Sequence, residues 1–369
     1  MSSFNNSQLV ALAIAPKCSA FLSILGSSYI IVKIVTSKSR RKRVHQRLLA
    51  GMSILDAFQS LAHFFSTWPI PAEDTYVKYA IGNNKTCSAQ GFFINFNVGV
   101  ALYHASLSVY YLLVIKYKFQ HKRIQKIEMV MHTLPVFYII VSGIFILMDD
   151  SFNNSGFFCW IASSRCEGDA CLRGRNAMTF LWIVLGLASL CMLIASICIF
   201  LLWLTIRKQE LGNRNRNIRF HIESRNVPGA QNTRPRSYLQ DSARQSVMFL
   251  GAFFMSWTIP IIDRILFHIY GYHIFVLYLA SGILHPLQGA FNILVFMRKS
   301  TKRERKTTNE DPPEPRFNLR LSFTSMISIL SGNKLNASNQ HMAVFQDTQL
   351  NECVTILEEG HNQLNNDKK

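Results

Sequence analysis

The chain alternates between long apolar blocks that are nearly free of charge and short segments rich in Lys and Arg. A helix needs about 20 mainly apolar residues to cross the hydrocarbon core of a bilayer. Seven blocks are long enough, and four of them contain no Asp, Glu, Lys or Arg. The pattern predicts membrane-spanning helices over about 9–35, 48–68, 92–115, 129–148, 177–206, 247–270 and 274–297.

We therefore expect an all-α membrane protein, a seven-transmembrane helix bundle. Buried core helices of a large soluble protein are the alternative, but uncharged runs of 20 to 30 residues argue against it. The expected organisation is an outer N-terminus at 1–8, the seven-helix domain at 9–300, a third inner loop at 207–246, and a largely disordered inner tail at 301–369.

The distribution of Lys and Arg between the loops predicts which way the bundle faces. The segments 36–47, 116–128, 207–246 and 298–306 carry net charges of +6, +4, +6 and +5, a total of +21. The intervening loops are neutral or slightly acidic. Because basic loops stay on the cytoplasmic side, the N-terminus is expected outside and the C-terminus inside.

Composition agrees with a membrane protein and excludes a typical nucleic-acid binder. The net charge is +18, but 49% of the residues are hydrophobic and only 16% are charged, against roughly 25% in an ordinary soluble domain. A soluble basic domain keeps its charge on a polar surface. We expect the lipid bilayer and no nucleic acid as partner, and docking of an acidic partner as a second use of the basic inner face.

Four cysteines lie on the predicted outer side, where oxidation to disulfides is favoured. We expect Cys87–Cys159, which would tie the start of the third span to the second outer loop, and Cys166–Cys171 within that loop. Cys87–Cys166 and Cys87–Cys171 are the alternatives, because connectivity does not follow from sequence alone.

Three glycosylation sequons, Asn-X-Ser/Thr, support the same orientation. They begin at Asn5, Asn84 and Asn153, all on the predicted outer side, while a fourth sequon at Asn336 lies in the predicted inner tail.

Polar residues recur at helical spacing inside several spans, and such residues normally face the bundle interior. Asp56, Ser108, Gln288 and Asn292 each lie about 7 to 13 Å from the inner end of their helix at 1.5 Å per residue. They are expected to meet in one inner polar network. The network either only satisfies buried polar groups, or forms a hydrated switch whose hydrogen bonds or bound cation differ between two states.

A second polar group is predicted nearer the outer face. Asp263 and Arg264 lie about 24 Å along the sixth span, at a depth similar to His63 and Asn97. These four residues form a candidate ligand pocket.

The sixth span also carries a candidate switch. Trp257 is expected near mid-membrane, and Pro260 three residues later removes a backbone donor and favours a kink. A kinked helix with a bulky side chain at the bend would move its inner end outward; an ordinary membrane proline beside a packing tryptophan is the alternative.

Three segments resemble G-protein-coupled receptors. The sequence at 47–56, RLLAGMSILD, resembles the second-helix motif of cAMP-receptor-like receptors, and 285–296, HPLQGAFNILVF, resembles their seventh-helix pattern. Cys159-Trp160 is similar to the Cys-Trp pair of the second outer loop in secretin-like and cAMP-receptor-like receptors, so Trp160 joins the candidate ligand pocket. The segments 66–71 and 107–115 are similar to uncharacterised algal receptors.

The resemblance implies a cell-surface receptor for an unknown extracellular ligand, with a heterotrimeric G protein and an arrestin-like protein as partners. The chain departs from rhodopsin-like receptors in having Ile115-Lys116-Tyr117 in place of Asp-Arg-Tyr and one extra residue between Trp257 and Pro260. Coupling to a G protein is therefore an inference from the fold, and cAMP is not implied as the ligand.

Other functions fit less well. A retinal protein needs a lysine in the last span, and 274–297 has none. A transporter would show matching interrupted helices in two halves, and no such symmetry is visible. The sequence has no catalytic or metal-binding motif, so we expect no enzyme, cofactor or metal. A seven-helix transporter or a sensor that does not couple to a G protein is the alternative.

Overall fold

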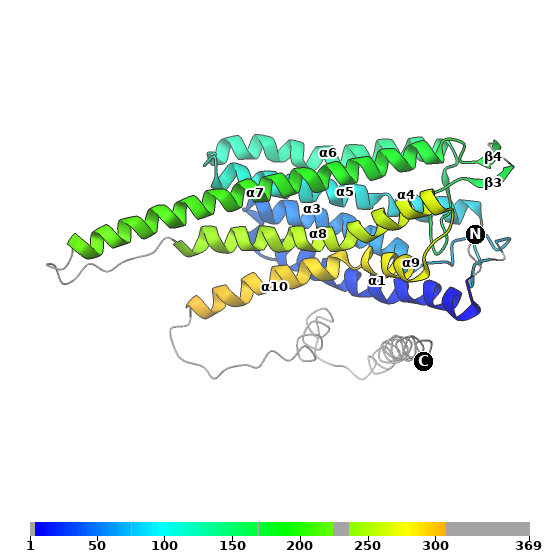
Figure 1. Ribbon diagram of the computed structural model, residues 1–369, viewed down its shortest axis with the longest axis horizontal. Helices are drawn as coiled ribbons and strands as arrows, with labels where there is room; N and C mark the ends of the chain where they lie inside the picture. Colours follow the sequence, from blue (N-terminus) through cyan, green and yellow to red (C-terminus); the bar gives the residue numbers. More distant parts are fainter. Residues whose placement is uncertain (1–3, 75, 168–169, 224–235, 308–369) are drawn as a thin grey trace.

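A computed structural model describes residues 4–74, 76–167, 170–223 and 236–307, and these form a bundle of seven spans that run side by side (Figure 1). Two spans are built from helix pairs. The spans are α1 (Asn6–Val35), α3 (Val44–Phe64), α4 (Asn84–Ile94) with α5 (Phe96–Ile115), α6 (His121–Met148), α7 (Ala177–Glu223), α8 (Arg236–Tyr270), and α9 (Phe275–Leu284) with α10 (Gln288–Thr307). The short α2 (Lys38–Arg41) lies between α1 and α3.

Composition alone marks six of these spans as able to cross a membrane. Five helices, counting α4 and α5 as one, are long and apolar enough, and the bent pair of α9 and α10 makes a sixth. The seventh, α3, is less apolar because it carries a row of polar residues. These residues face the interior and are buried; they include Ser53, Asp56, Gln59, Ser60 and His63. The seven-helix expectation is confirmed.

The bundle is apolar outside and partly polar inside, the reverse of a soluble protein. Phe137 of α6 is 63% exposed and Ile197 of α7 is 50% exposed, whereas Asp56 and Gln59 are completely buried. Large exposed apolar faces are what a protein presents to lipid. Two apolar clusters fill the interior, one around Phe253 and Trp257 and one around Met52.

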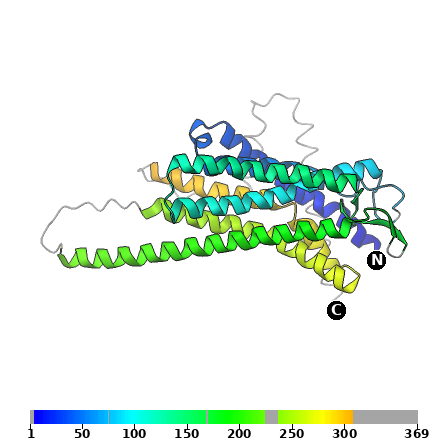
Figure 2. The same ribbon diagram turned by 90° about the horizontal axis from the view of Figure 1, so that it is seen from above.

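Two helices extend farther than the hydropathy pattern predicts. The segment 207–246 was expected to be a loop, but α7 continues to Glu223 and α8 already begins at Arg236 (Figures 1 and 2). The apolar block marks where lipid ends, not where the helix ends, and Arg, Lys, Gln and Glu favour helix in water. The expected inner tail lies outside the described residues after 307.

The last span bends sharply between its two helices. The axes of α9 and α10 differ by 51°. Pro286 lies in the break, where its missing N–H removes a hydrogen bond from the helix ladder. The bend therefore has a local cause in the sequence.

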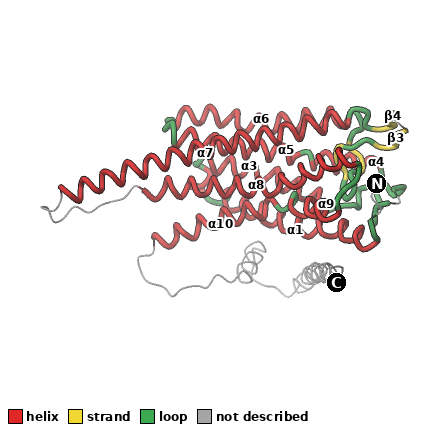
Figure 3. The backbone as a smooth tube through the Cα atoms, viewed as in Figure 1, coloured by secondary structure: helices red, strands yellow, loops and turns green. Residues whose placement is uncertain are grey.

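The strands of the described residues, β1 to β4, gather at one end of the bundle, the end that the charge pattern predicts to be outside (Figure 3). We call it the outer end. The antiparallel pairs β1 (Phe152–Asn154) with β2 (Cys159–Ile161) and β3 (Ser164–Glu167) with β4 (Ala170–Arg173) form the loop between α6 and α7.

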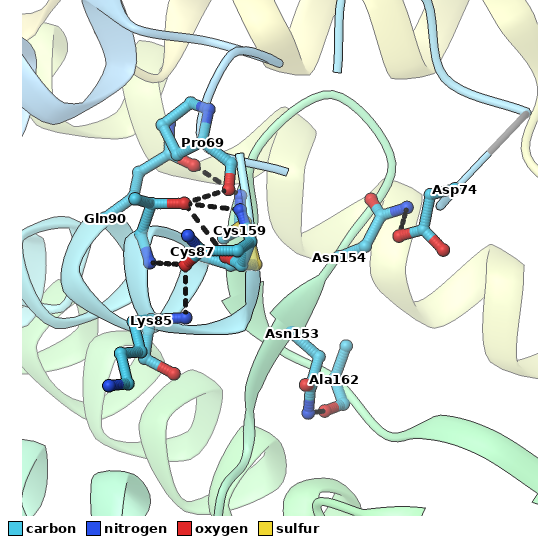
Figure 4. Close-up of a disulfide and its surroundings, with 12 residues drawn as sticks. Pro69, Asp74, Lys85, Cys87, Gln90, Asn153, Asn154, Cys159 and Ala162 are labelled. Carbon is cyan, nitrogen blue, oxygen red and sulfur yellow. Dashed lines mark hydrogen bonds between the residues drawn. A yellow bond between two sulfur atoms is a disulfide. The ribbon is translucent and has the colours of Figure 1, made fainter. Parts of the chain in front are cut away.

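A disulfide joins this loop to the start of α4 (Figure 4). Cys87 is bonded to Cys159, as predicted. Gln90 reinforces the same attachment, because its Oε1 accepts from the Cys159 N–H at 2.9 Å and its Nε2 donates to the carbonyls of Ala62 and Ser66. The strand register also places Cys166 opposite Cys171. Their side chains lie outside the described residues, so that second bridge stays a prediction.

The three outer sequons differ in accessibility. Asn5 and Asn84 are exposed at the N-terminal ends of α1 and α4. Asn153 is buried, and its amide nitrogen, the atom that would carry the sugar, donates to the carbonyls of Asp150 and Ala162 (Figure 4). The structure therefore contradicts glycosylation at Asn153: its amide holds the loop together.

Replacing both Cys87 and Cys159 with Ser is expected to lower the free energy of unfolding by about 2–4 kcal/mol, because the bridge closes a long loop. Thermal unfolding of the purified protein measures the loss. A reductant should lower the unfolding midpoint of the wild type by more than that of the double variant. Equal effects on the two proteins would show that this bridge contributes no stability.

Candidate functional site

A small cavity lies at the outer end, between the β1–β2 loop and the helices α7, α8 and α9. Its volume is about 20 Å³, room for about one water molecule. The lining is mostly aromatic with a few polar groups: Phe157, Phe158, Trp160, Leu185, Trp257, Pro260, Asp263, Arg264, Tyr278, Ser281 and His285. We call this the outer cavity. Five residues predicted for the ligand pocket and the switch therefore lie around one space.

The β1–β2 loop covers the cavity and is fastened to two helices through Ser155. The Arg264 guanidinium donates to the Ser155 hydroxyl, and the Tyr278 hydroxyl donates to the Ser155 carbonyl at 2.8 Å. The next residue, Gly156, has φ +115°, and a Cβ there would overlap the Tyr278 hydroxyl. The close approach of loop and helix therefore requires glycine at 156.

Asp263 and Arg264 are neighbours in sequence but have different partners. The Asp263 carboxylate is 3% exposed and lies 3.2 Å from His273 Nδ1. The His273 ring is stacked on those of Phe267 and Tyr278, at 4.2 and 4.1 Å between centroids. Asp263 is thus held toward the α8–α9 connection, while Arg264 is turned to the loop.

His63 and Asn97 do not line the cavity; they reach it through His285. The Asn97 amide nitrogen is hydrogen-bonded to His285 Nε2, and because an amide nitrogen only donates, the histidine nitrogen accepts. The rings of His63 and Trp257 each lie 5.4 Å from that of His285. His285 was not predicted as a pocket residue, although its position on the polar face of the last span, beside Pro286, was a usable signal.

The inner polar network is centred on Asp56. Its carboxylate accepts from Ser23 at 3.3 Å, from Gln59 at 2.8 Å and from Ser27. The Ser23 hydroxyl also accepts from the Gly289 N–H at 2.8 Å. The network therefore joins α1, α3 and α10.

The other predicted members of the network are arranged differently. Gln288 Nε2 donates to His104 Nε2 at 2.6 Å, and the His104 ring is stacked on Phe253. Ser108 donates to the His104 carbonyl of its own helix. Asn292 is completely buried, and its amide has no hydrogen-bond partner among the described residues.

The partners of Asp56 on α1 were missed from the sequence. Ser23 and Ser27 are four residues apart and so share a helix face, with Gly26 beside them. Small residues on one face let helices approach closely in membranes. A Cβ on Gly26 would overlap the Gly289 backbone, so α1 and α10 do approach this way. The serine pair with glycine was the available signal.

Comparison with known proteins identifies the fold. No family model matches the chain, and no curated protein matches it in sequence. Among solved structures, squid rhodopsin has a similar fold: the TM-score is 0.61 at 14% identity, over 86% of this chain and 92% of the rhodopsin chain. The chain therefore shares the seven-helix fold of squid rhodopsin. The nearer resemblance to cAMP-receptor-like receptors is not supported by these matches.

Replacing Gly289 with Ala is expected to destabilise the protein by about 1–3 kcal/mol, because the added Cβ would overlap Asp56 Oδ2 and the Ser27 hydroxyl. The matched control is Gly186→Ala on the exposed face of α7, where a Cβ meets nothing within 4 Å. Thermal unfolding of both variants checks the difference. A Gly289→Ala protein as stable as Gly186→Ala would contradict the close packing around Asp56.

Proposed function

We propose that this protein is a cell-surface receptor that binds an extracellular ligand in the outer cavity and signals through its inner face to a heterotrimeric G protein. The observation that carries the proposal is the position of Trp257. It lines the outer cavity and contacts the His285 ring, one residue before the proline at the bend of the last span. A ligand that presses on Trp257 would thereby act on two spans at once.

The contacts below the cavity support the same function. His285 is followed by Pro286 and, within one turn, by Gln288 and Gly289, which contact His104 and the Asp56 group. Both spans that meet at Trp257 also continue to the inner end of the bundle. A change of the bend would alter these buried hydrogen bonds, and a discrete rearrangement of such contacts is what a two-state switch requires.

The inner face suits a large acidic partner. The inner segments carry most of the positive charge of the chain, and α7 projects beyond the inner ends of its neighbours (Figure 1). We place the G protein there, and an arrestin-like protein as a second partner. As a cell-surface receptor, the protein would lie in the plasma membrane. The apolar part of the last span, 274–297, has no lysine, so the proposed ligand is not a retinal bound as a Schiff base.

The proposal is tested by measuring basal activation of each G-protein class in cells that express the receptor, normalised to surface expression. Trp257→Leu removes the ring contact with His285. A contact worth about 1 kcal/mol shifts a two-state equilibrium about fivefold, so basal activation of the coupled class is expected to rise severalfold.

Trp203→Leu is the matched control, because Trp203 is 45% exposed on the lipid-facing side of α7. This variant is expected to behave as the wild type. If neither the wild type nor Trp257→Leu activates any class at normal surface expression, G-protein coupling is wrong. A transporter or a sensor of another kind, the alternatives left by the sequence, would then be favoured.

A further inference from the structure

The outer cavity contains hydrogen-bond donors that its own residues do not use. The indole nitrogens of Trp160 and Trp257 and the hydroxyl of Ser281 are buried and have no partner among the described residues. These side chains are 5%, 1% and 5% exposed. An indole N–H only donates, and a buried donor without a partner is destabilising. The cavity therefore has more buried hydrogen-bond donors than acceptors to pair with them.

Arg264 adds a positive charge to this set of donors. Its guanidinium has five N–H groups and donates to the neutral Ser155 hydroxyl. It also lies over the Trp160 ring, 6.0 Å from the centroid. In the described part of the chain, no carboxylate forms a salt bridge with it. The charge of Arg264 thus faces the cavity without an anionic partner.

The acid of the lining does not supply that partner. Asp263 lies against His273 Nδ1 at 3.2 Å, on the side of the α8–α9 connection. The rest of the lining is mostly apolar, with the rings of Phe157, Phe158 and Tyr278 packed against one another. A molecule that satisfies the site needs an anionic acceptor group at one end and an apolar body at the other.

We propose that the outer cavity recognises a small organic carboxylate with an apolar body. This inference rests on the proposed receptor function and names the ligand class of the same site. The carboxylate accepts from Arg264 and from the Trp160 N–H, as guanidinium and carboxylate match in geometry. The apolar body packs among the loop phenylalanines, and Trp257 and Ser281 donate to a polar atom of the ligand or to a water.

Binding requires the loop to move. The cavity of about 20 Å³ is too small for such a ligand, and Ser155 lies against the guanidinium and accepts from its Nη2. The carboxylate therefore replaces the Ser155 hydroxyl on Arg264, and residues 155–158 shift outward about Gly156. The hydrogen bond between Arg264 and Ser155 holds the loop in its closed position.

The test uses the full-length protein in lipid nanodiscs with three probes of one shape: phenylacetate, phenylacetamide and phenethylamine. Thermal unfolding and tryptophan fluorescence are followed as each probe is titrated at constant ionic strength. Phenylacetate is expected to raise the unfolding midpoint and change the fluorescence saturably, with an affinity at least about tenfold above the neutral and cationic probes, since charge-assisted hydrogen bonds are the strong ones.

Variants assign the effect to the cavity. Arg264→Gln should weaken phenylacetate binding at least about tenfold, and Arg264→Lys should retain part of it. Arg175→Gln, at an exposed position of the same outer loop, is the matched control and should bind as the wild type. If Arg264→Gln fails to fold, Trp160→Phe keeps an aromatic ring at this position but removes the indole N–H, and should weaken binding severalfold.

Several results would overturn the proposal. Stronger binding of phenethylamine would assign recognition to Asp263 and a cation. Equal binding of all three probes would contradict recognition of the carboxylate. Phenylacetate binding that survives both Arg264→Gln and Trp160→Phe would contradict it as well. Octanoate, a short fatty acid, is added as a fourth probe. If its binding depends on Arg264, the proposed carboxylate ligand is supported and its source is the bilayer.

The experiments distinguish a failure of the proposed ligand class from a failure of the proposed receptor function. Phenylacetate binding without activation of any G-protein class leaves the ligand class standing and contradicts the receptor function. Basal G-protein activation that rises in Trp257→Leu, together with absent carboxylate binding, does the opposite.

Discussion

A bilayer offers buried polar side chains no partner except one another, and this constraint organises the inner half of the bundle. The Asp56 carboxylate is satisfied only because two serines of α1 and Gln59 of its own helix point at it. Those contacts in turn require α10 to approach α1 through Gly26 and Gly289. The polar group therefore determines where three helices lie, and the apolar side chains fill the space around it.

The outer half follows a different principle, because one of its walls is a loop. The Cys87–Cys159 disulfide and Gln90 hold that loop to α4, and Ser155 holds it to α8 and α9. Here the polar groups are not matched: donors exceed acceptors around a cavity closed by aromatic rings. The inner half also keeps unmatched groups, such as the Asn292 amide, but its one carboxylate, that of Asp56, accepts three hydrogen bonds.

Much of the fold was predictable from the sequence, and the errors have physical causes. The centres of the spans and the Cys87–Cys159 bridge follow from apolar blocks and cysteine positions. The length of α7 does not, because hydropathy reports contact with lipid and a helix continues into water when its residues favour helix. The sequon at Asn153 was misleading because three residues of sequence contain no information about burial. The predicted orientation rests on the charges of the loops and on the positions of the sequons, and it stays a prediction.

The sequence by itself determined which residues of each helix are buried and which face lipid, because that depends only on the spacing of residues along one helix. Only the tertiary structure decided which hidden groups meet. Asn97, His63 and Trp257 come from three different spans and converge on His285, and Ser108 bonds to its own helix instead of to Asp56. Such pairings depend on how neighbouring helices rotate and how closely they approach, and these distances are set by packing between helices, which no periodicity within a single helix contains.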